Sequence, residues 1–407
     1  MSLTRRDFLT SLPGLALTGA ACRAEAQNRA GTSANAAPPD ELVRLAGGCI
    51  LAGSRMFGLH PILRTMLTRK ALGGVLIAHE NFSDAATLAN LCRDVRNAMP
   101  PDEPPPLIAA DQEGGTVSHL SPPLPWMPGI PTLGDLDDTD LTERWGQAMG
   151  TLLRRTGMNF NLAPVLDVRT NPRNMVVHGR TFGSRPELVA RHGPPLIRGL
   201  TGTGVLACAK HFPGHGDTRE DSHTMLPVVP HGLTRLDAVE LVPFRAVATT
   251  VPAVMVAHVI YQGIDASRPA TLSPTILRDV LRDRVGFGGV AVSDDLEMYA
   301  IRHYHGVPEG AVKALEAGCD LVIIAHTPVH ARDAAVAMAR KAARDSAFRT
   351  RLEEAAGRVR RMRAWLQTPL PPNPYAVDPV AVIRETQRRA RERGQAPTRA
   401  ADPTLQR

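Results

Sequence analysis

Aromatic residues are scarce in this sequence, and their scarcity excludes one class of partner. Phe, Trp and Tyr make up 4% of its 407 residues, too few for the stacking platforms that bind single-stranded nucleic acid. The formal net charge of +7 does not point to nucleic acid either, because much of the excess lies in the Arg-rich tail from Arg384 to Arg407. A basic run of that kind is usually a solvated surface. We therefore expect no nucleic-acid partner.

Cysteine and the common metal and nucleotide motifs are also scarce or missing. The five cysteines, Cys22, Cys49, Cys92, Cys208 and Cys319, mostly lie in or beside apolar runs. They resemble small buried residues rather than a disulfide framework. The sequence has no HExxH or CxxC pattern, so nothing predicts a closed metal site. We expect neither a metal nor a cofactor.

The sequence has no apolar run that predicts a permanent membrane span. The apolar stretch Leu9–Ala21 is too short, but it follows a twin-arginine motif at Thr4–Leu9 and precedes Ala24-Glu25-Ala26, which fits a cleavage site. We interpret residues 1–26 as a twin-arginine export signal and residues 27–39 as a linker. The expected product is a periplasmic or secreted protein, and a monomer. Lipid attachment at Cys22 is the less favoured alternative, because Gly19 stands where a lipoprotein motif has Leu.

Eight apolar runs, each followed by a helical or loop-rich interval, dominate the sequence from residue 40 onward. Parallel strands that are buried on both faces have this continuous apolar pattern. The alternation predicts an α/β fold, a single (β/α)8 barrel over residues 40–368. An open doubly wound sheet is the alternative, although no GxGxxG turn follows any strand. The runs are Gly48–Ala52, Gly74–Ala78, Pro106–Ala110, Asn159–Pro164, Val205–Ala209, Ala253–Ala257, Gly289–Val292 and Leu321–Ala325.

The C-terminal part of the barrel region is predicted to be helical. An Ala-rich pattern with a 3.6-residue period extends from about Pro328 to Gln367. Its last part is amphipathic and is expected to pack on the outside of the barrel through one apolar face. That face comprises Leu352, Ala355, Val359, Met362 and Trp365. Residues 369–407 form a Pro/Arg-rich tail, expected to be disordered or to hold a short accessory helix.

Polar motifs follow five of the eight apolar runs, at the point where each predicted strand ends. In a barrel the carboxyl ends of the strands converge on one face, and that face holds the active site. This convergence favours an enzyme over a set of unrelated surface loops. The motifs are Asp111–Gly115, Asn161–Val168, Lys210-His211, His258 and Ser293-Asp294-Asp295.

The stretch from Lys210 to His223 is the most informative of these motifs. Its Pro and Gly residues predict a loop that begins where the fifth strand ends. Asp221 stands two residues before His223, so its carboxylate can accept the imidazole N–H and raise the basicity of the ring. Metal ligation by His211, His215 and His223 is the alternative, although their spacing matches no common ligand pattern.

These motifs resemble glycoside hydrolase family 3, and specifically its β-N-acetylhexosaminidase branch. The resemblance covers most of residues 42–365. It rests on Asp-Gln-Glu-Gly-Gly at 111–115, on Asn-Leu-Ala-Pro-Val-Leu-Asp at 161–167, and on Ser-Asp-Asp-Leu at 293–296. The most specific match is Lys-His-Phe-Pro-Gly-His-Gly at 210–216, followed after four residues by Asp-Ser-His. Members of this branch are similar in having one barrel without the second domain of family β-glucosidases.

The resemblance implies catalytic and binding roles. Asp294 matches the nucleophile of a retaining double displacement, with His223 as the acid/base and Asp221 as its partner. A His can fill this role because its pKa lies near neutrality. Asp295 is the less favoured nucleophile. The positions that match sugar-binding residues are Asp111, Arg180, Lys210 and His211, with a surface ion pair as the alternative for Arg180. His258 matches a position near the site, or is a buried core residue.

The sequence departs from the family pattern at one binding position. Where the family continues its Asp-Gln-Glu-Gly-Gly motif with Arg-Val-x-Arg, this chain has Thr116-Val117-Ser118-His119. His119 therefore replaces an Arg expected to contact substrate, and it is shorter and only partly charged near neutral pH. The export signal is a second departure, this time from the cytoplasmic members that recycle peptidoglycan.

The leading hypothesis is an exo-acting retaining β-N-acetylhexosaminidase. Its expected partners are saccharides that contain N-acetylglucosamine, such as cell-wall fragments or chitooligosaccharides. A β-glucosidase or a glycoside phosphorylase of the same family is the alternative within the enzyme class. A sugar-binding protein without activity is the alternative from another class, suggested only by His119.

Overall fold

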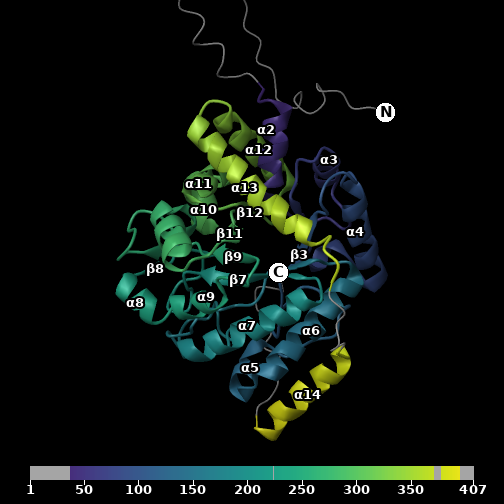
Figure 1. The fold of residues 1–407 in the computed structure, drawn as a ribbon, viewed down its shortest axis with the longest axis vertical. Helices are drawn as coiled ribbons and strands as arrows, with labels where there is room; N and C mark the ends of the chain where they lie inside the picture. The colour runs from purple at the N-terminus through teal and green to yellow at the C-terminus, as the bar shows by residue number, and fades with distance from the viewer. Residues whose placement is uncertain (1–36, 223, 371–376, 395–407) are drawn as a thin grey trace, which may run out of the picture.

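A computed structural model describes residues 37–222, 224–370 and 377–394 of the chain. The signal predicted for residues 1–26, Cys22 and most of the predicted linker lie outside these residues. Figure 1 shows helices arranged around a central set of strands. No helix in the described ranges is long and apolar enough to cross a membrane.

Eight parallel strands close into a barrel, which confirms the predicted fold class. Their order around the barrel is β1-β12-β11-β9-β7-β6-β3-β2, and each strand overlaps one of the eight predicted runs. The strands are β1 (Ile50–Ala52), β2 (Gly74–Leu76), β3 (Leu107–Ala110), β6 (Phe160–Asn161), β7 (Leu206–Phe212), β9 (Ala253–Val256), β11 (Val290–Asp295) and β12 (Leu321–Ile324).

Helices surround the barrel and connect its strands. They are α2 (Asp40–Gly48), α3 (Pro61–Thr68), α4 (Ala85–Ala98), α5 (Ile130–Leu136), α6 (Thr139–Thr156), α7 (Pro186–Gly202), α8 (Leu233–Ala238), α9 (Leu241–Val247), α10 (Tyr299–His305), α11 (Val307–Ala317), α12 (Pro328–Ala342) and α13 (Ser346–Trp365). Short helices η1 (His79–Asn81) and η2 (Ala270–Leu272) and the longer η3 (Thr275–Arg284) lie between them. Two small sheets pair β4 (Gln112–Gly114) with β5 (Val117–Ser118), and β8 (Val228–Val229) with β10 (Ile260–Tyr261).

The strands read as unbroken apolar runs because both of their faces are buried. Ile50 and Ala52 of β1 belong to the core between strands and helices, whereas Leu51 between them belongs to the cluster inside the barrel. Successive side chains of a strand point to opposite faces, so each strand needs apolar residues at every position. The cysteines follow the same logic, since Cys49, Cys92, Cys208 and Cys319 are all buried free thiols, as predicted.

The fifth strand extends further than the sequence predicted. We expected a loop from Lys210 onward, but β7 continues through Lys210 and His211 to Phe212. The predicted boundary was wrong because polar residues at the end of a barrel strand can keep their backbone hydrogen bonds to the neighbouring segment of the barrel. The backbone of Lys210 donates to Pro164 O and accepts from Leu166 N. Lys210 and His211 are therefore held by strand geometry rather than by a loop.

The predicted C-terminal helical region is two helices, and the second does not pack only on the outside of the barrel. Asp345 begins α13 by accepting a hydrogen bond from Phe348 N at 3.0 Å. Val359 and Met362 of α13 belong to the cluster inside the barrel. In Figure 1 α13 runs diagonally toward the centre of the barrel. The last part of this helix thus closes the N-terminal end of the barrel, and the predicted exterior position holds only for its first part, where Leu352 and Ala355 belong to the core between strands and helices.

A further helix, α14 (Pro379–Glu392), lies within the predicted tail. It packs beside α6 and α5 at one side of the molecule (Figure 1). Val382, Ile383 and Ala390 are buried in this contact. Arg144 of α6 makes two hydrogen bonds to Glu385, at 2.7 and 2.9 Å.

A buried carboxylate joins α13 to the strands. Asp320 is fully buried just before β12. It accepts hydrogen bonds from Arg282 at 2.6 Å, Arg351 at 2.7 Å and Arg358 at 3.2 Å. It also accepts from the backbone N–H of Ala291 at 3.0 Å. Three guanidinium groups from η3 and α13 thus depend on one carboxylate.

We expect Asp320→Ala to lower the free energy of unfolding by about 3–5 kcal/mol, because it leaves three partly buried guanidinium groups without their shared counter-ion. Urea unfolding followed by circular dichroism measures the change. Asp94→Ala serves as the matched control, since Asp94 forms an exposed pair with Arg64 at 3.0 Å and should contribute about 0.2–1 kcal/mol. Equal effects of the two substitutions would contradict a structural role for the buried cluster.

Candidate active site

A pocket of ≈ 240 Å³ opens at the carboxyl ends of the barrel strands. This is the face on which barrel enzymes place their catalytic groups. All five binding residues predicted from the sequence, together with Asp294, line this one pocket. The polar and charged lining residues are Asp111, His119, Arg180, Lys210, His211, His215, Ser222, Asp294, Asp295 and His326.

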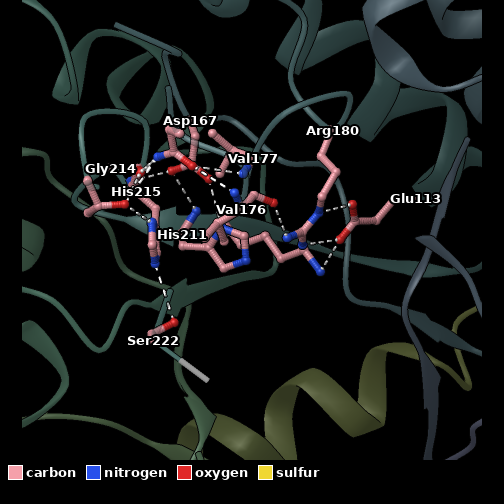
Figure 2. A network of polar contacts seen from close by, with 12 residues as sticks. Glu113, Asp167, Val176, Val177, Arg180, His211, Gly214, His215 and Ser222 are labelled. Carbon is pink, nitrogen blue, oxygen red and sulfur yellow. Dashed lines mark hydrogen bonds and ion pairs between the residues drawn. The ribbon is translucent and has the colours of Figure 1, made fainter. Parts of the chain in front are cut away.

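A buried charge network forms one wall of the pocket. Lys210 Nζ lies 2.5 Å from Asp111 Oδ1 and 2.6 Å from Glu113 Oε1. Arg180 donates two hydrogen bonds to Glu113, at 2.9 and 2.8 Å, as Figure 2 shows. Only 2% of the Lys210 and Glu113 side chains is exposed. Two cations and two carboxylates therefore balance each other, as buried charges require.

This network keeps its members charged. Burial alone would raise the pKa of Glu113, but Arg180 and Lys210 hold it well below its ordinary value. Burial would lower the pKa of Lys210, but Asp111 and Glu113 raise it above its ordinary value. Arg180 is thus an internal partner of the site, and the surface-pair alternative for it does not fit. Asp111, with about a quarter of its side chain exposed, can accept hydrogen bonds from a ligand.

A second network orients His211. The fully buried Asp167 accepts a hydrogen bond from His211 Nδ1 at 2.7 Å and from the backbone N–H of His215 at 2.6 Å (Figure 2). Burial opposes ionisation of Asp167, but His211 outweighs it and lowers the pKa of the carboxyl group. Because an ionised carboxylate only accepts, the hydrogen on His211 lies on Nδ1. His211 Nε2 is then the ring atom available to a ligand.

His215 supports the loop that carries the predicted acid/base. Its Nδ1 lies 2.8 Å from Thr218 Oγ1, and its Nε2 lies 3.4 Å from Ser222 Oγ. Burial, with a smaller contribution from the neighbouring His211, lowers the pKa of His215 to about 4. His215 is therefore neutral near pH 7 and acts as a fixed hydrogen-bonding group. Ser222, which it contacts, stands between Asp221 and His223.

His223 itself lies outside the residues that the structure describes, so the Asp221–His223 pair is not described. The backbone carbonyl of Asp221 accepts from Thr224 N at 3.0 Å and from Met225 N at 2.9 Å. In the described ranges, no group of three His, Cys, Asp or Glu side chains could hold a metal ion. The ring nitrogens of His215 and Nδ1 of His211 are occupied by the hydrogen bonds given above.

The two adjacent carboxylates of β11 differ in their surroundings. Asp294 Oδ1 accepts a hydrogen bond from Asp295 N at 2.8 Å, and the Asp294 side chain lines the pocket. Asp295 Oδ1 accepts from the backbone N–H groups of Glu297 and Ala325, at 3.0 and 3.1 Å. Burial, with Glu297 and Asp294 nearby, raises the pKa of Asp295 to about 7. Asp295 thus ties β11 to the end of β12.

His258 and His119 occupy opposite kinds of environment. His258 is fully buried; its Nδ1 lies 2.8 Å from Thr271 Oγ1, and its Nε2 lies 3.0 Å from the carbonyl of Asp295. It fits the alternative of a buried core residue beneath the site. His119 lines the pocket and stacks on His79 with ring centroids 6.0 Å apart. Its Nδ1 is buried without a hydrogen-bond partner among the described residues.

Sequence reasoning assigned no role to two residues on which the site depends. Glu113 joins Lys210 to Arg180, and Asp167 orients His211. Both residues lie in motifs identified in the sequence. A carboxylate can be assigned as the partner of a buried cation or imidazole, however, only when the group that it contacts is known. A buried Lys or Arg at a strand end requires a carboxylate nearby. Lys210 at the end of its strand was therefore the sequence feature that could have pointed to Glu113.

Fold and site together define a barrel enzyme whose pocket is lined by charged hydrogen-bonding groups, with the adjacent carboxylates Asp294 and Asp295 at the end of β11. The family model for the glycosyl hydrolase family 3 N terminal domain matches residues 59–362. The chain belongs to glycoside hydrolase family 3 and is a glycoside hydrolase, as the resemblance predicted.

Two curated relatives are similar to this chain in sequence. A beta-hexosaminidase from Stenotrophomonas maltophilia (strain K279a) is 37% identical over 270 residues, which span 65% of this chain and 79% of the relative. One from Alkalilimnicola ehrlichii is 38% identical over 291 residues, spanning 69% and 82%.

Solved structures of similar proteins share the fold of this chain. A glycoside hydrolase family 3 beta-N-acetylglucosaminidase from Paenibacillus sp. str. FPU-7 superposes with a TM-score of 0.78 at 36% identity, covering 85% of this chain and 68% of that chain. A beta-N-acetylhexosaminidase from Beutenbergia cavernae DSM 12333 superposes with a TM-score of 0.74 at 29% identity, covering 79% and 98%.

The raised pKa of Asp295 predicts a pH dependence of stability. In the unfolded chain this carboxyl ionises near its ordinary value of 3.8, whereas in the folded protein it keeps its proton up to about pH 7. The folded state therefore binds more protons across this window, and the free energy of unfolding falls as pH rises through it. Asp295→Asn removes this titration. We expect the loss of stability between pH 5 and pH 8 to shrink by about 1–3 kcal/mol in the variant, measured by urea unfolding. The same pH profile in both proteins would contradict the assignment.

Proposed function

We propose that the chain is an exported, exo-acting, retaining β-N-acetylhexosaminidase. It removes terminal non-reducing N-acetylglucosamine from cell-wall fragments or chitooligosaccharides. The observation that carries this proposal is the pocket, where a strand-end carboxylate faces a network of charged donors and acceptors suited to sugar hydroxyls. The names of the relatives, beta-hexosaminidase and beta-N-acetylglucosaminidase, support the choice of sugar.

In the first step, the Asp294 carboxylate attacks the anomeric carbon while the leaving oxygen takes a proton from His223. The bond to the leaving group breaks, and a glycosyl-enzyme ester forms on Asp294. In the second step, neutral His223 takes a proton from water, which attacks the anomeric carbon and releases Asp294. The role of Asp221 is to hold the His223 ring, as the resemblance implies.

The surrounding groups orient the terminal sugar. Asp111 accepts from sugar hydroxyls, and Lys210, held between two carboxylates at 2.5 and 2.6 Å, donates to them. His211 presents Nε2 because Asp167 fixes its Nδ1 hydrogen. These groups are positioned before the ligand arrives, which lowers the cost of organising them during the reaction. His119, at the position of the family Arg, adds a weaker contact.

We expect Asp294→Ala to lower kcat for an aryl β-N-acetylglucosaminide by about 10³-fold or more, because it removes the carboxylate that forms the ester. Release of the aryl alcohol measures the rate. Asp283→Ala, which removes an exposed carboxylate from η3, is the control and should retain full activity. A fluorinated sugar that traps the ester should add its mass to the peptide that contains Asp294. Labelling of a different peptide would exclude Asp294 as the nucleophile.

The sugar specificity can be tested with paired substrates. We expect kcat/KM for the aryl β-N-acetylglucosaminide to exceed that for the matching β-glucoside by about 10²-fold or more. An enzyme that hydrogen-bonds the acetamido group leaves its own polar groups unpaired when the glucoside binds, and this lowers kcat/KM for the glucoside. The rates are measured with and without EDTA and with and without phosphate. A preference for the glucoside would contradict the proposal, and a rate that requires phosphate would identify a phosphorylase. Loss of activity in EDTA would identify a metal-dependent enzyme.

A further inference from the structure

The N-terminal end of the barrel carries a second concave surface, on the face opposite to the pocket. It is a groove of ≈ 590 Å³. Its walls are the last turns of α13 and the two loops that enter β9 and β11, at residues 248–252 and 286–289. Leu206 and Val290, the first residues of β7 and β11, form part of its floor together with Met362. All three floor residues are buried.

Three hydrogen-bond donors in this groove are unused. The Trp365 side chain is 37% exposed, although the amphipathic pattern of α13 predicted it on the buried face. Arg361, one turn earlier, is exposed, and Thr249 is exposed on the facing loop. Within the described part of the chain, none of these side chains makes a hydrogen bond or an ion pair. An indole N–H, a guanidinium and a hydroxyl are thus available at one groove.

The groove is electropositive. Arg358 and Arg361 line it, and no carboxylate is among the described residues that do so. The charge of Arg358 is partly offset by Asp320 at 3.2 Å, which lies behind it and is fully buried. The charge of Arg361 is not offset by any described residue. An acidic ligand would therefore be attracted to this side of α13.

The chemistry of the groove fits an acidic saccharide better than an apolar partner. The flat face of an indole can pack against the apolar C–H face of a pyranose ring, while its N–H still donates a hydrogen bond. A guanidinium binds a carboxylate through two parallel hydrogen bonds. An apolar helix would leave these donors buried and unpaired, which is costly. The volume lies in the ordinary range for ligand sites, about 300–1,000 Å³.

We propose that this groove is a second, non-catalytic binding site for an acidic glycan, a saccharide strand that carries carboxylates. The two sites lie at opposite ends of the barrel, so a strand bound in the groove leaves the catalytic pocket open to a chain end. The groove would keep the enzyme on a polymer between turnovers. This proposal does not rest on the sugar specificity proposed above, because the groove shares no residue with the pocket.

Cosedimentation with insoluble peptidoglycan, whose strands carry carboxylates, tests the proposal. The full chain is used with Asp294→Asn to prevent hydrolysis and with saturating N-acetylglucosamine to occupy the pocket. We expect Trp365→Ala and Arg361→Ala each to weaken binding by about tenfold. Binding should also weaken with added salt, because the attraction is electrostatic. In the background that retains Asp294, both variants should hydrolyse a soluble aryl substrate at the parent rate.

Arg384→Ala is the matched control, because Arg384 is an exposed residue of α14, away from the groove. It removes the same charge as Arg361→Ala and should leave binding unchanged. Equal weakening by Arg384→Ala would show a general charge effect and overturn the proposal. Absence of binding by the parent, parent-like binding by both groove variants, or equally tight binding to neutral chitin would also overturn it. Thermal unfolding of each variant verifies that the fold is intact.

Discussion

The buried Lys210 is the constraint on which the arrangement of the site depends. With 2% of its side chain exposed, it has lost its water and needs carboxylates in its place. Asp111, directly after β3, and Glu113, in β4, supply them, and Glu113 in turn holds Arg180. Three segments far apart in the sequence are therefore fixed to one another by charge. The pocket wall is set before a ligand enters, which is the condition for electrostatic catalysis.

The sequence predicted the barrel well because both faces of each strand are buried. Every strand then shows a continuous apolar run, and the eight runs gave the eight strands in order. The end of β7 was misplaced because Lys210 and His211 are polar. Yet Lys210 is held by backbone hydrogen bonds to the segment after β6, and the backbone N–H of His211 donates to the Asp167 carboxylate. From sequence alone, a polar residue after an apolar run is read as the start of a loop. At the mouth of a barrel, however, such a residue can still belong to the strand and face the pocket.

The remaining errors and omissions of the sequence-based prediction have one cause. The residues around a side chain in sequence do not show which distant residue it will contact. Glu113 could not be assigned without Lys210, nor Asp167 without His211. The position of α13 shows the same limit. The apolar stripe of α13 is buried up to Met362, as its pattern predicted. The pattern could not show that Val359 and Met362 pack into the open end of the barrel. Trp365 continues the stripe beyond the barrel end and is left exposed.

The balance of charges in the pocket also explains how the chain tolerates His119 in place of the family Arg. Asp111 and Glu113 are already matched by Lys210 and Arg180, so neither carboxylate of this network needs a cation at position 119. The fold therefore does not require a cation at position 119. His119 lies at the pocket wall instead, where its Nδ1 is buried without a partner among the described residues. Position 119 can thus change substrate binding while the four-charge network stays intact.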